Sequence, residues 1–403
     1  MSRTTRTDPR RLCVAIDATP LLAPLTGIGV MCREIIRELS QRESLIVSAF
    51  AVSWRRRASI AASLPGSVSS RQRPMPARPL HWCWSRSQFP PGEWFLKDHD
   101  VVHGTNFVVP PMLRSARVVS VHDLTPLHFP ELCNPATLIY PEAIRRAVRS
   151  GAWVHTDSTF IAEEVVEAFG ADPERVRTVY LGVPPFPPAG SAGSADSTDP
   201  EARGRLRVVD EESGRELEPA RRYIVSVGTA EPRKDLCGLV EAFSLIAEER
   251  DDVDLVLAGP RGWGSEQLDS SIRASRFASR IFRTGWVDDE LLAGLIGRAS
   301  LLAYPSLYEG FGLPPLQAMS VGVPVVATSS GSIPEILGDA AVLVGPRDKE
   351  ALGEALAGVL DSKERRDDLV GKGFRRAGEF SWEKCAEGLD ALYHDAAKSV
   401  VRR

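Results

Sequence analysis

The chain has 403 residues, enough for two to three domains of roughly 150 residues each, so a large core can form without disulfide or metal support. Hydrophobic residues make up 43% and charged residues 25%, and 49 basic against 53 acidic side chains leave a charge of −4, which argues against a dedicated nucleic-acid-binding protein. Six scattered cysteines without a CxxC, no apolar signal region at the start and no apolar run long enough for a bilayer predict a reduced, cytoplasmic protein.

The amino half alternates short apolar strands with helical patterns. The first strand, at 12–17, is followed by a loop with Gly27 and Gly29 and then by an amphipathic helix. Later strands are expected at 45–52, 100–103, 118–121, 153–156 and 177–180. This alternation predicts a doubly wound parallel sheet with helices on both faces, which is a Rossmann-like α/β domain over residues 1–185.

A second domain of the same kind follows a segment without periodicity. Residues 186–220 are rich in Pro, Gly, Ser and Ala and are predicted to form a linker. The alternation restarts over 221–381, where strands are expected at 223–227, 253–258, 281–284, 301–304, 323–327 and 341–344. A terminal helix at 382–403 is expected to pack back on the first domain. Two such domains predict a cleft between them, with the ligand beyond the carboxyl ends of the strands.

The loop with Gly27 and Gly29 has two interpretations. Its backbone can approach a phosphate where the next helix offers free N–H groups, or its glycines can form a tight turn that packs the strand on the helix. The loop lacks the third glycine of the dinucleotide fingerprint and an acidic residue about 20 positions later. These two features argue against a site for NAD.

Residues 227–235, VGTAEPRKD, place two cations and a small-residue turn at the carboxyl end of a strand. Arg233 offers a fork of donors and Lys234 a mobile charge, so together they suit a diphosphate leaving group. Asp235 is predicted to cap the helix that follows. The alternative is a solvated loop whose cations pair with Glu231.

A third motif at 304–319, YPSLYEGFGLPPLQAM, again has the order strand, glycine loop, helix. With VGTAEPRKD before it and VPVVATSSGSIPEILGDAAVLVGPRD after it, the carboxyl half resembles the nucleotide-sugar domain of family-4 glycosyltransferases, and the similarity covers residues 223–350. It continues more loosely through the loop with Gly27 and Gly29, through His122-Asp123-Leu124 and through Thr156-Asp157-Ser158. The resemblance implies the GT-B fold, in which two doubly wound Rossmann-like domains face a cleft.

Members of this family transfer a sugar from a nucleotide diphosphate to an acceptor with retention of configuration, usually without a metal. The resemblance implies that Arg233 and Lys234 hold the diphosphate, with Gly228 of the same loop close to the donor. It assigns the donor sugar to Glu309 and to the backbone of Phe311, Gly312 and Leu313. The cations fit this role, because negative charge builds on the departing phosphate in the transition state. The nucleotide sugar is the donor substrate, and no bound cofactor or metal is expected.

Gln317 departs from the family pattern, in which a second glutamate eight positions after the first meets the nucleotide ribose. Its carbonyl can still accept a hydrogen bond, but the charge-assisted part is lost, which weakens donor binding by about 1 kcal/mol. The departure also argues against a glycosidase, whose two carboxylates lie about 5 to 9.5 Å apart, because eight helical residues from Glu309 span about 12 Å. Asp235, where asparagine is common, adds negative charge near the phosphates.

His122 follows the predicted strand at 118–121. By the same resemblance it contacts the reacting sugar, whereas the residues alone also allow a strand-end histidine hydrogen-bonded to Asp123. A metal site is disfavoured, because no further ligands converge on it by spacing. Three other histidines are interpreted as structural: His103, His128 and His155.

Residues 51–86 contain seven arginines, three tryptophans and no acidic residue. Such a stretch suits an anionic membrane surface or a lipid diphosphate. The alternative is a solvated loop with its tryptophans in the core. The first interpretation predicts that the amino domain makes peripheral contact with the inner face of the membrane.

Together these features predict a retaining glycosyltransferase acting on a glycan or lipid-linked acceptor. EPRKD and YEGFGLPPLQAM resemble bacterial mannosyltransferases of polysaccharide assembly, which implies GDP-mannose as the donor and leaves UDP-sugars open. Two alternatives remain. A nucleotide-sugar 2-epimerase would use the same diphosphate site but would need acid and base groups around the sugar, and a non-catalytic partner would only bind the nucleotide sugar or the glycan.

Overall fold

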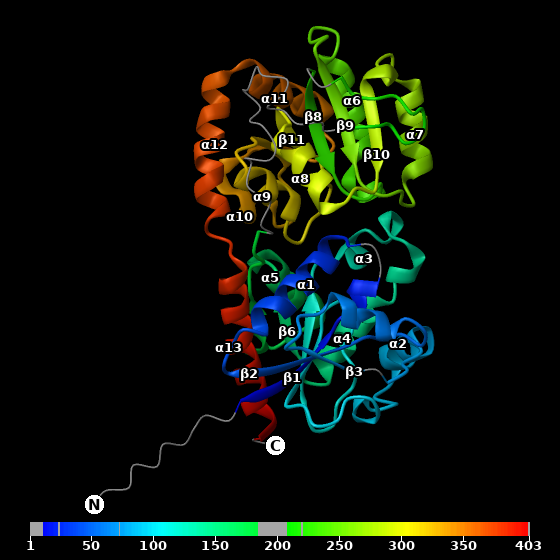
Figure 1. The fold of residues 1–403 in the computed structure, drawn as a ribbon, viewed down its shortest axis with the longest axis vertical. Coiled ribbons are helices and arrows are strands. Elements are labelled where there is room, and N and C mark those ends of the chain that lie inside the picture. Colours follow the sequence, from blue (N-terminus) through cyan, green and yellow to red (C-terminus); the bar gives the residue numbers. More distant parts are fainter. Residues whose placement is uncertain (1–10, 23–24, 72, 184–207, 219–220, 402–403) are drawn as a thin grey trace, which may run out of the picture. The chain divides into compact units, whose positions relative to one another are not determined.

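The chain divides into two compact units, and in each of them helices alternate with strands along the sequence (Figure 1). The computed structural model describes residues 11–22, 25–71, 73–183, 208–218 and 221–401, so residues 186–207 and 219–220 of the predicted linker lie outside the described residues. Unit 1 comprises Met1–Leu127, Ala136–Gly182 and Ser381–Arg403. Unit 2 comprises His128–Pro135 and Val183–Phe380.

Unit 1 is built on a seven-stranded sheet with the order β3-β2-β1-β4-β5-β6-β7, in which all neighbours are parallel. The four central strands end in buried residues, as expected for parallel strands covered on both faces. The strands are β1 (Leu12–Asp17), β2 (Leu45–Phe50), β3 (Ser69–Arg71), β4 (Val101–Gly104), β5 (Ala116–Val121), β6 (Trp153–Thr156) and β7 (Val176–Thr178). The helices are α1 (Gly27–Leu39), α2 (Ala77–Arg86), α3 (Thr125–His128), α4 (Tyr140–Arg149), α5 (Thr159–Phe169) and α13 (Trp382–Val401).

Unit 2 is built on a six-stranded parallel sheet with the order β10-β9-β8-β11-β12-β13. The strands are β8 (Arg222–Val227), β9 (Val253–Ala258), β10 (Ile281–Gly285), β11 (Leu301–Tyr304), β12 (Val325–Thr328) and β13 (Val342–Val344). The helices are α6 (Leu236–Ile246), α7 (Ser265–Ala274), α8 (Asp289–Gly297), α9 (Leu313–Ser320), α10 (Ile333–Leu337), α11 (Lys349–Asp361) and α12 (Lys363–Ala377). Side chains from the sheet, α6, α7, α11 and α12 share one buried hydrophobic cluster.

These two sheets confirm the predicted fold class of two doubly wound Rossmann-like α/β sheets. Two elements within the arginine- and tryptophan-rich stretch, β3 and α2, were not predicted. None of the helices in the described part of the chain combines the length and apolarity needed to span a bilayer.

Residues 208–218, at the end of the predicted linker, are packed on unit 2. Val209 and Glu216 form a β-bridge, and the Asp210 carboxylate accepts a hydrogen bond of 2.9 Å from the backbone nitrogen of Arg283 in β10. The Arg283 guanidinium in turn pairs with Glu211 at 3.2 Å and with buried Asp269. Composition marked this segment as linker because its anchoring partners lie about 70 residues away in the sequence.

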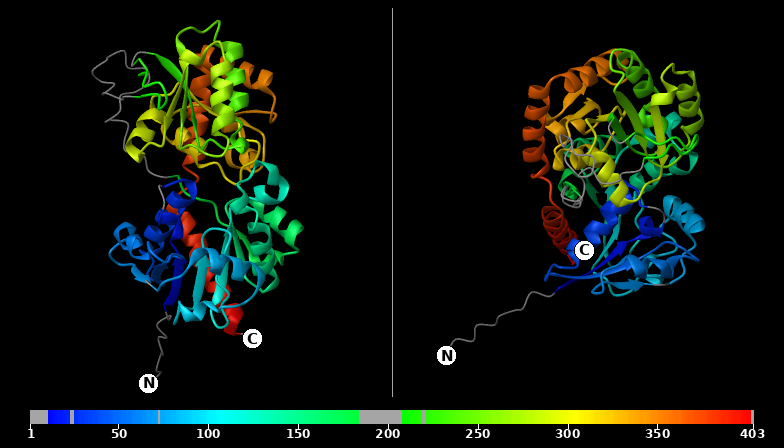
Figure 2. Two further views of the ribbon diagram at one scale, coloured as in Figure 1. Left: turned by 90° about the vertical axis from the view of Figure 1, so that its right-hand side faces the viewer. Right: turned by 45° about the horizontal axis from the view of Figure 1, so that its top comes forward.

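The carboxyl-terminal helix α13 belongs to unit 1. In both views of Figure 2 it lies alongside the unit 1 sheet, and it contacts β4, β5 and α1. A hydrogen bond of 2.7 Å joins the Tyr393 hydroxyl of α13 to His103 Nδ1 of β4, and both side chains are fully buried. The end of the chain is therefore part of the amino-terminal core.

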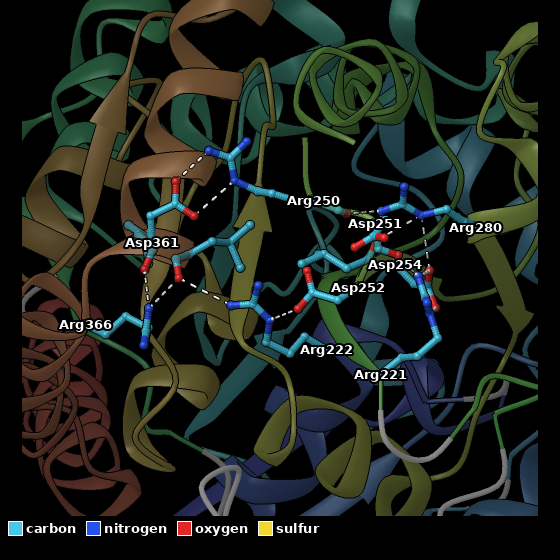
Figure 3. Close-up of polar contacts among 12 residues, drawn as sticks. Arg221, Arg222, Arg250, Asp251, Asp252, Asp254, Arg280, Asp361 and Arg366 are labelled. Atoms are coloured by element: carbon cyan, nitrogen blue, oxygen red, sulfur yellow. Dashed lines mark hydrogen bonds and ion pairs between the residues drawn. The ribbon is translucent and has the colours of Figure 1, made fainter. Parts of the chain in front are cut away.

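Ion pairs tie the amino ends of the unit 2 strands to nearby helix ends (Figure 3). The buried Asp254 carboxylate receives two hydrogen bonds from Arg221, at 2.7 and 2.8 Å, and lies 3.5 Å from Arg280. Arg222 pairs with Asp252, and Arg250 pairs with Asp361 at the end of α11. The strands are parallel, so these contacts fix the sheet edge opposite to the carboxyl ends where ligands bind.

Candidate active site

The strand order of unit 2 reverses between β8 and β11, which are neighbours in the sheet but lie on either side of two intervening strands in sequence. In open parallel sheets ligands bind at such a reversal, beyond the carboxyl ends of the strands. The loop after β8 (228–235) contains Arg233 and Lys234, and the loop after β11 (305–312) contains Glu309. The backbone of the two loops is joined where Leu307 N donates to Arg233 O at 2.8 Å.

Glu309 pairs with both cations, one at each carboxylate oxygen. Lys234 Nζ lies 2.6 Å from Oε1, and Arg233 Nη1 lies 2.8 Å from Oε2. Lys234 Nζ also donates to the Tyr304 hydroxyl at 2.9 Å, and Arg233 Nη1 donates to the Tyr308 carbonyl at 2.8 Å. The three charged side chains are only 9–15% exposed. The sequence had separated the predicted diphosphate ligands from the predicted sugar ligand, whereas the structure brings them together in one cluster.

The charge state of this cluster follows from its geometry. Burial by itself would raise the pKa of Glu309, but the adjacent Arg233 and Lys234 outweigh it and lower the pKa to about 2. Burial by itself would lower the pKa of Lys234, but Glu309 raises it above its usual value. Burial and the Glu309 carboxylate raise the pKa of Tyr304 to about 12. At neutral pH the cluster therefore holds two cations, one anion and a neutral phenol.

Glu231, the partner expected if the loop were merely solvated, lies 3.5 Å from Arg233 Nη2. This separation is longer than the 2.8 Å between Arg233 and Glu309, so the carboxylate on the neighbouring loop is the closer partner. Asp235 fulfils its predicted role, because its side chain accepts a hydrogen bond of 3.3 Å from Gly238 N and caps α6. The cap sets the start of α6 directly after the segment that contains Arg233 and Lys234.

The loop between β12 and α10 binds the backbone of Glu309 and its neighbours, and the sequence had assigned it no role at the site. Ser332 N donates to the Glu309 carbonyl at 2.9 Å, and the Ser330 hydroxyl donates to the Leu307 carbonyl. Gly331 has φ +60°, and a Cβ there would lie 2.2 Å from Glu309 O. The small residues of the segment SSGS at 329–332 allow this close approach, and they are the feature from which the contact could have been predicted in the sequence.

The remaining residues predicted around the donor lie at the same edge. A Cβ on Gly228 would lie 3.3 Å from Lys234 Cε, so this glycine leaves room for the lysine. Gly312 has φ +103° and stands immediately before α9. The side chains of Phe311, Leu313 and Gln317 are buried, and the Phe311 ring packs edge-on against Phe380. Because these side chains are buried, a contact between a ligand and Phe311 or Leu313 would be made through the backbone.

In unit 1 the predicted glycine loop opens α1. Gly27 is exposed at the first position of the helix, and Gly29 is buried. A Cβ on Gly29 would lie 3.0 Å from the Leu25 side chain and 3.4 Å from Pro20 O. Gly29 thus serves the close packing of the turn, while Gly27 at the exposed helix start leaves its backbone accessible.

His122 follows β5 at the carboxyl edge of the unit 1 sheet and is paired with Asp157, not with Asp123. Its Nδ1 lies 2.6 Å from Asp157 Oδ2, and its Nε2 lies 2.8 Å from the carbonyl oxygen of Thr105. Asp123 instead accepts a hydrogen bond from Thr125 N. Burial by itself would lower the pKa of His122, but Asp157 outweighs it and raises the pKa above its usual value.

The other three histidines have different surroundings. His103 and His155 are fully buried in the unit 1 sheet, where Ser120 bridges them, whereas His128 packs near the Tyr308 ring in unit 2. Over the described residues there is no group of three or more His, Cys, Asp or Glu side chains that could hold a metal ion.

Two family models match the chain and together cover most of it. One is described as glycosyl transferases group 1 and matches residues 209–376, and the other is described as glycosyltransferase family 4 and matches residues 25–185. The first match contains Arg233, Lys234 and Glu309, and the second contains His122. The models therefore cover both the cluster at the reversal point of unit 2 and the histidine pair of unit 1.

Two relatives of this chain are named mannosyltransferases. O-antigen chain mannosyltransferase B of Escherichia coli is 30% identical over 91% of this chain and 95% of its own length. The MMP alpha-(1->4)-mannosyltransferase of Mycolicibacterium hassiacum is 30% identical over 65% of this chain and 58% of its own length. These names do not favour the epimerase or the non-catalytic partner.

Solved structures share the fold at low sequence identity. Sucrose-phosphate synthase from Thermosynechococcus elongatus has a TM-score of 0.73 at 18% identity and covers 96% of this chain and all of its own. WaaG, a glycosyltransferase of lipopolysaccharide biosynthesis, has a TM-score of 0.67 at 18% identity over 96% of this chain and 99% of its own. HepE of Anabaena, solved with UDP, has a TM-score of 0.65 at 16% identity over 95% of this chain and all of its own. The expected GT-B fold is thereby confirmed.

Proposed function

The chain belongs to glycosyltransferase family 4 and is a glycosyltransferase, and we propose that it transfers mannose from GDP-mannose, with retention, to a glycan or lipid-linked acceptor. The cation cluster at the reversal point of the unit 2 sheet carries the proposal. Support for mannose comes from the two mannosyltransferases named among the relatives. Support for a nucleotide-sugar donor comes from HepE structures solved with UDP and with UDP-glucose.

In this proposal Arg233 and Lys234 hold the diphosphate. Lys234 has three N–H groups, and within the described residues two of them are used by Glu309 and Tyr304, so one remains for a phosphate oxygen. As the glycosidic bond breaks, negative charge grows on the departing phosphate. Cations that are already held in place stabilise this charge without first having to reorganise.

The other donor contacts are part of the same proposal. Glu309, fixed by both cations and by the backbone of the 329–332 loop, positions the donor sugar through its carboxylate. The backbone of Phe311, Gly312 and Leu313 and the loop with Gly228 meet the donor, and Gln317 accepts a hydrogen bond from the ribose. The loop with Gly27 and Gly29 offers backbone N–H groups to the diphosphate. His122 contacts the reacting sugar.

The reaction then needs neither a bound cofactor nor a metal, since two side-chain cations supply the charge that a metal would otherwise supply. The departing phosphate accepts the proton of the acceptor hydroxyl, so the attacking face needs no protein base. This proton route keeps the attacking hydroxyl on the face that the leaving group vacates, as retention requires.

Thermal shift with the full chain separates the donor classes. GDP, UDP, ADP and dTDP are added at equal concentration, and we expect the largest stabilisation with GDP, about 2.7 kcal/mol at 100 times its dissociation constant. Transfer from GDP-mannose and from UDP-glucose to a lipid-linked acceptor is then compared. Preferred stabilisation by UDP together with transfer only from UDP-glucose would refute GDP-mannose as the donor.

Peripheral membrane contact through residues 51–86 is a further part of the proposal. Trp54 and Trp82 are each 60% exposed, and Arg86 lies over the Trp82 ring at 4.8 Å, whereas Trp84 is buried. Exposed tryptophan beside arginine suits the interface of an anionic bilayer. Co-sedimentation with anionic and neutral vesicles at low salt tests it, and a W54S/W82S variant is expected to lose the binding. Equal binding to both kinds of vesicle would contradict the proposal.

A further inference from the structure

The hydrogen bonds of the buried pair of His122 and Asp157 indicate the protonation state of the His122 ring. Nδ1 contacts the Asp157 carboxylate at 2.6 Å and Nε2 contacts the Thr105 carbonyl at 2.8 Å. A carbonyl oxygen and an ionised carboxylate can only accept hydrogen bonds. With Asp157 ionised, both ring nitrogens carry a hydrogen to make these two contacts, which makes the side chain an imidazolium.

We propose that His122 acts in sugar transfer as a fixed imidazolium, and that Asp157 is the positioning residue that holds it in this form and orientation. The inference rests on the proposed function, because it takes His122 as the residue that meets the reacting sugar. What it adds is the protonation state of that residue and a role for Asp157, which lies in the segment Thr156-Asp157-Ser158 but had no role assigned to it from the sequence.

The buried Asp157 carboxylate needs a charged partner, just as the His122 imidazolium does. Its side chain is 4% exposed, and within the described residues its second oxygen, Oδ1, makes no hydrogen bond. His155 Nε2 lies 3.7 Å from Oδ1, but this nitrogen donates to the Val179 carbonyl at 3.1 Å. A buried carboxylate needs a charged partner, and His122 supplies it.

The two neighbouring histidines differ from His122, because each has a hydroxyl partner, which can donate as well as accept, so a neutral ring satisfies all of their hydrogen bonds. In its neutral form His155 donates from Nε2 to the Val179 carbonyl and accepts at Nδ1 from the Ser120 hydroxyl, which lies 2.8 Å away. Ser120 then accepts from His103 Nε2 at 2.8 Å, and His103 Nδ1 accepts from the Tyr393 hydroxyl at 2.7 Å. Burial lowers the pKa of both rings, in agreement with these neutral tautomers.

The titratable groups that face the pair come from four parts of unit 1. They are Asp123 on the same loop, His155 on β6, His103 on β4 and the buried Cys385 thiol on α13, whose pKa is raised by burial and by Asp157. Of these, Asp123 is the other carboxylate, and it accepts a hydrogen bond from Thr125 N. Asp123 therefore provides a matched control for Asp157.

The protonated form has a mechanistic consequence. An imidazolium whose two N–H groups are both held by protein acceptors has no lone pair to take a proton. His122 therefore does not act as the base for the acceptor hydroxyl. Its proposed role is to contact the reacting sugar with a charged ring whose orientation is fixed by Asp157 and Thr105, at the carboxyl edge of the unit 1 sheet.

The direct test is nitrogen NMR of the full-length chain labelled at histidine, recorded without substrate from pH 5 to 9. For the natural sequence we expect both His122 nitrogens to be protonated at pH 7. In Asp157→Asn the pKa of His122 is expected to fall by about one unit or more, because a carboxylate within hydrogen-bond distance is removed. Asp123→Asn is expected to shift it by much less, and Asp157→Glu to restore part of the loss. One unprotonated nitrogen at pH 7 in the natural sequence, or equal shifts in the two asparagine variants, would overturn the proposal.

Transfer kinetics supply the second measurement. If the imidazolium is the working form, activity falls as pH rises through the pKa of His122, and in Asp157→Asn this fall moves to lower pH. A variant that only lost stability would keep the original pH profile, and that result would overturn the positioning role. If transfer is absent at every pH while NMR shows the imidazolium, the proposed function fails and the protonation state stands, so the two failures are distinguishable.

Discussion

Replacing Glu309 with glutamine tests whether the ion cluster of unit 2 is as tightly coupled as its distances indicate. The pKa of Glu309 lies at about 2 in the folded protein against an ordinary value of 4.5. A difference of about 2.5 units corresponds to about 3 kcal/mol, since each unit is about 1.4 kcal/mol. Because the folded pKa is depressed, this contribution is fully present above the unfolded pKa and is lost as pH falls through about 2.

We therefore expect Glu309→Gln to destabilise unit 2 by about 3 kcal/mol at pH 7 and by only about 1 kcal/mol near pH 3. Urea unfolding followed by hydrogen exchange in the unit 2 strands measures this difference without assuming that both units unfold together. Asp367→Asn, which removes an exposed pair with Lys363, is the matched control and should change stability by less than about 0.5 kcal/mol. A loss for Glu309→Gln that stays constant from pH 7 to pH 3 would refute the electrostatic origin.

Three further substitutions test the site. Lys234→Ala is expected to lower transfer at least about 100-fold, because it removes a fixed charge from the leaving phosphate, while Lys349→Ala, at an exposed pair with Glu241, leaves turnover unchanged. Gly331→Ala puts a Cβ 2.2 Å from the Glu309 carbonyl oxygen at a residue whose backbone is left-handed, and it should reduce both donor binding and stability. Gly297→Ala, with open space around the added Cβ, should change neither. Calorimetry with the nucleotide measures the affinity of both variants. Gln317→Glu should tighten donor binding about fivefold in the same titration, and an unchanged affinity would show that this side chain does not meet the ribose.

The sequence predicted those features that depend on local pattern. Alternation of strands and helices gave both parallel sheets, since each strand and each helix is recognised over a few residues. Asp235 was predicted as a helix cap from its place before an apolar helix, and its hydrogen bond to Gly238 confirms it. The diphosphate motif was conspicuous because two adjacent cations followed a strand.

The sequence could not supply the partners of these residues. Lys234 and Glu309 are 75 positions apart, and their contact depends on β8 and β11 being neighbours, which becomes visible only when the strand order is known. His122 and Asp157 are 35 positions apart and meet because β5 and β6 are adjacent, whereas Asp123, beside His122 in sequence, turns to the next helix. Side-chain partners across strands are set by sheet order, and local pattern does not contain that order.

The same reasoning explains why the chemistry gathers at the carboxyl edges of the two sheets. In unit 2, β8 and β11 are neighbours at the point where the strand order reverses, and in open parallel sheets ligands bind beyond the carboxyl ends of the strands at such a point. Burying two cations there without an anion would be costly, and Glu309 offsets that cost in the resting protein. In the proposed function a diphosphate would bring further negative charge to cations already held in place, so the carboxylate that stabilises the cations would also keep them organised for the donor.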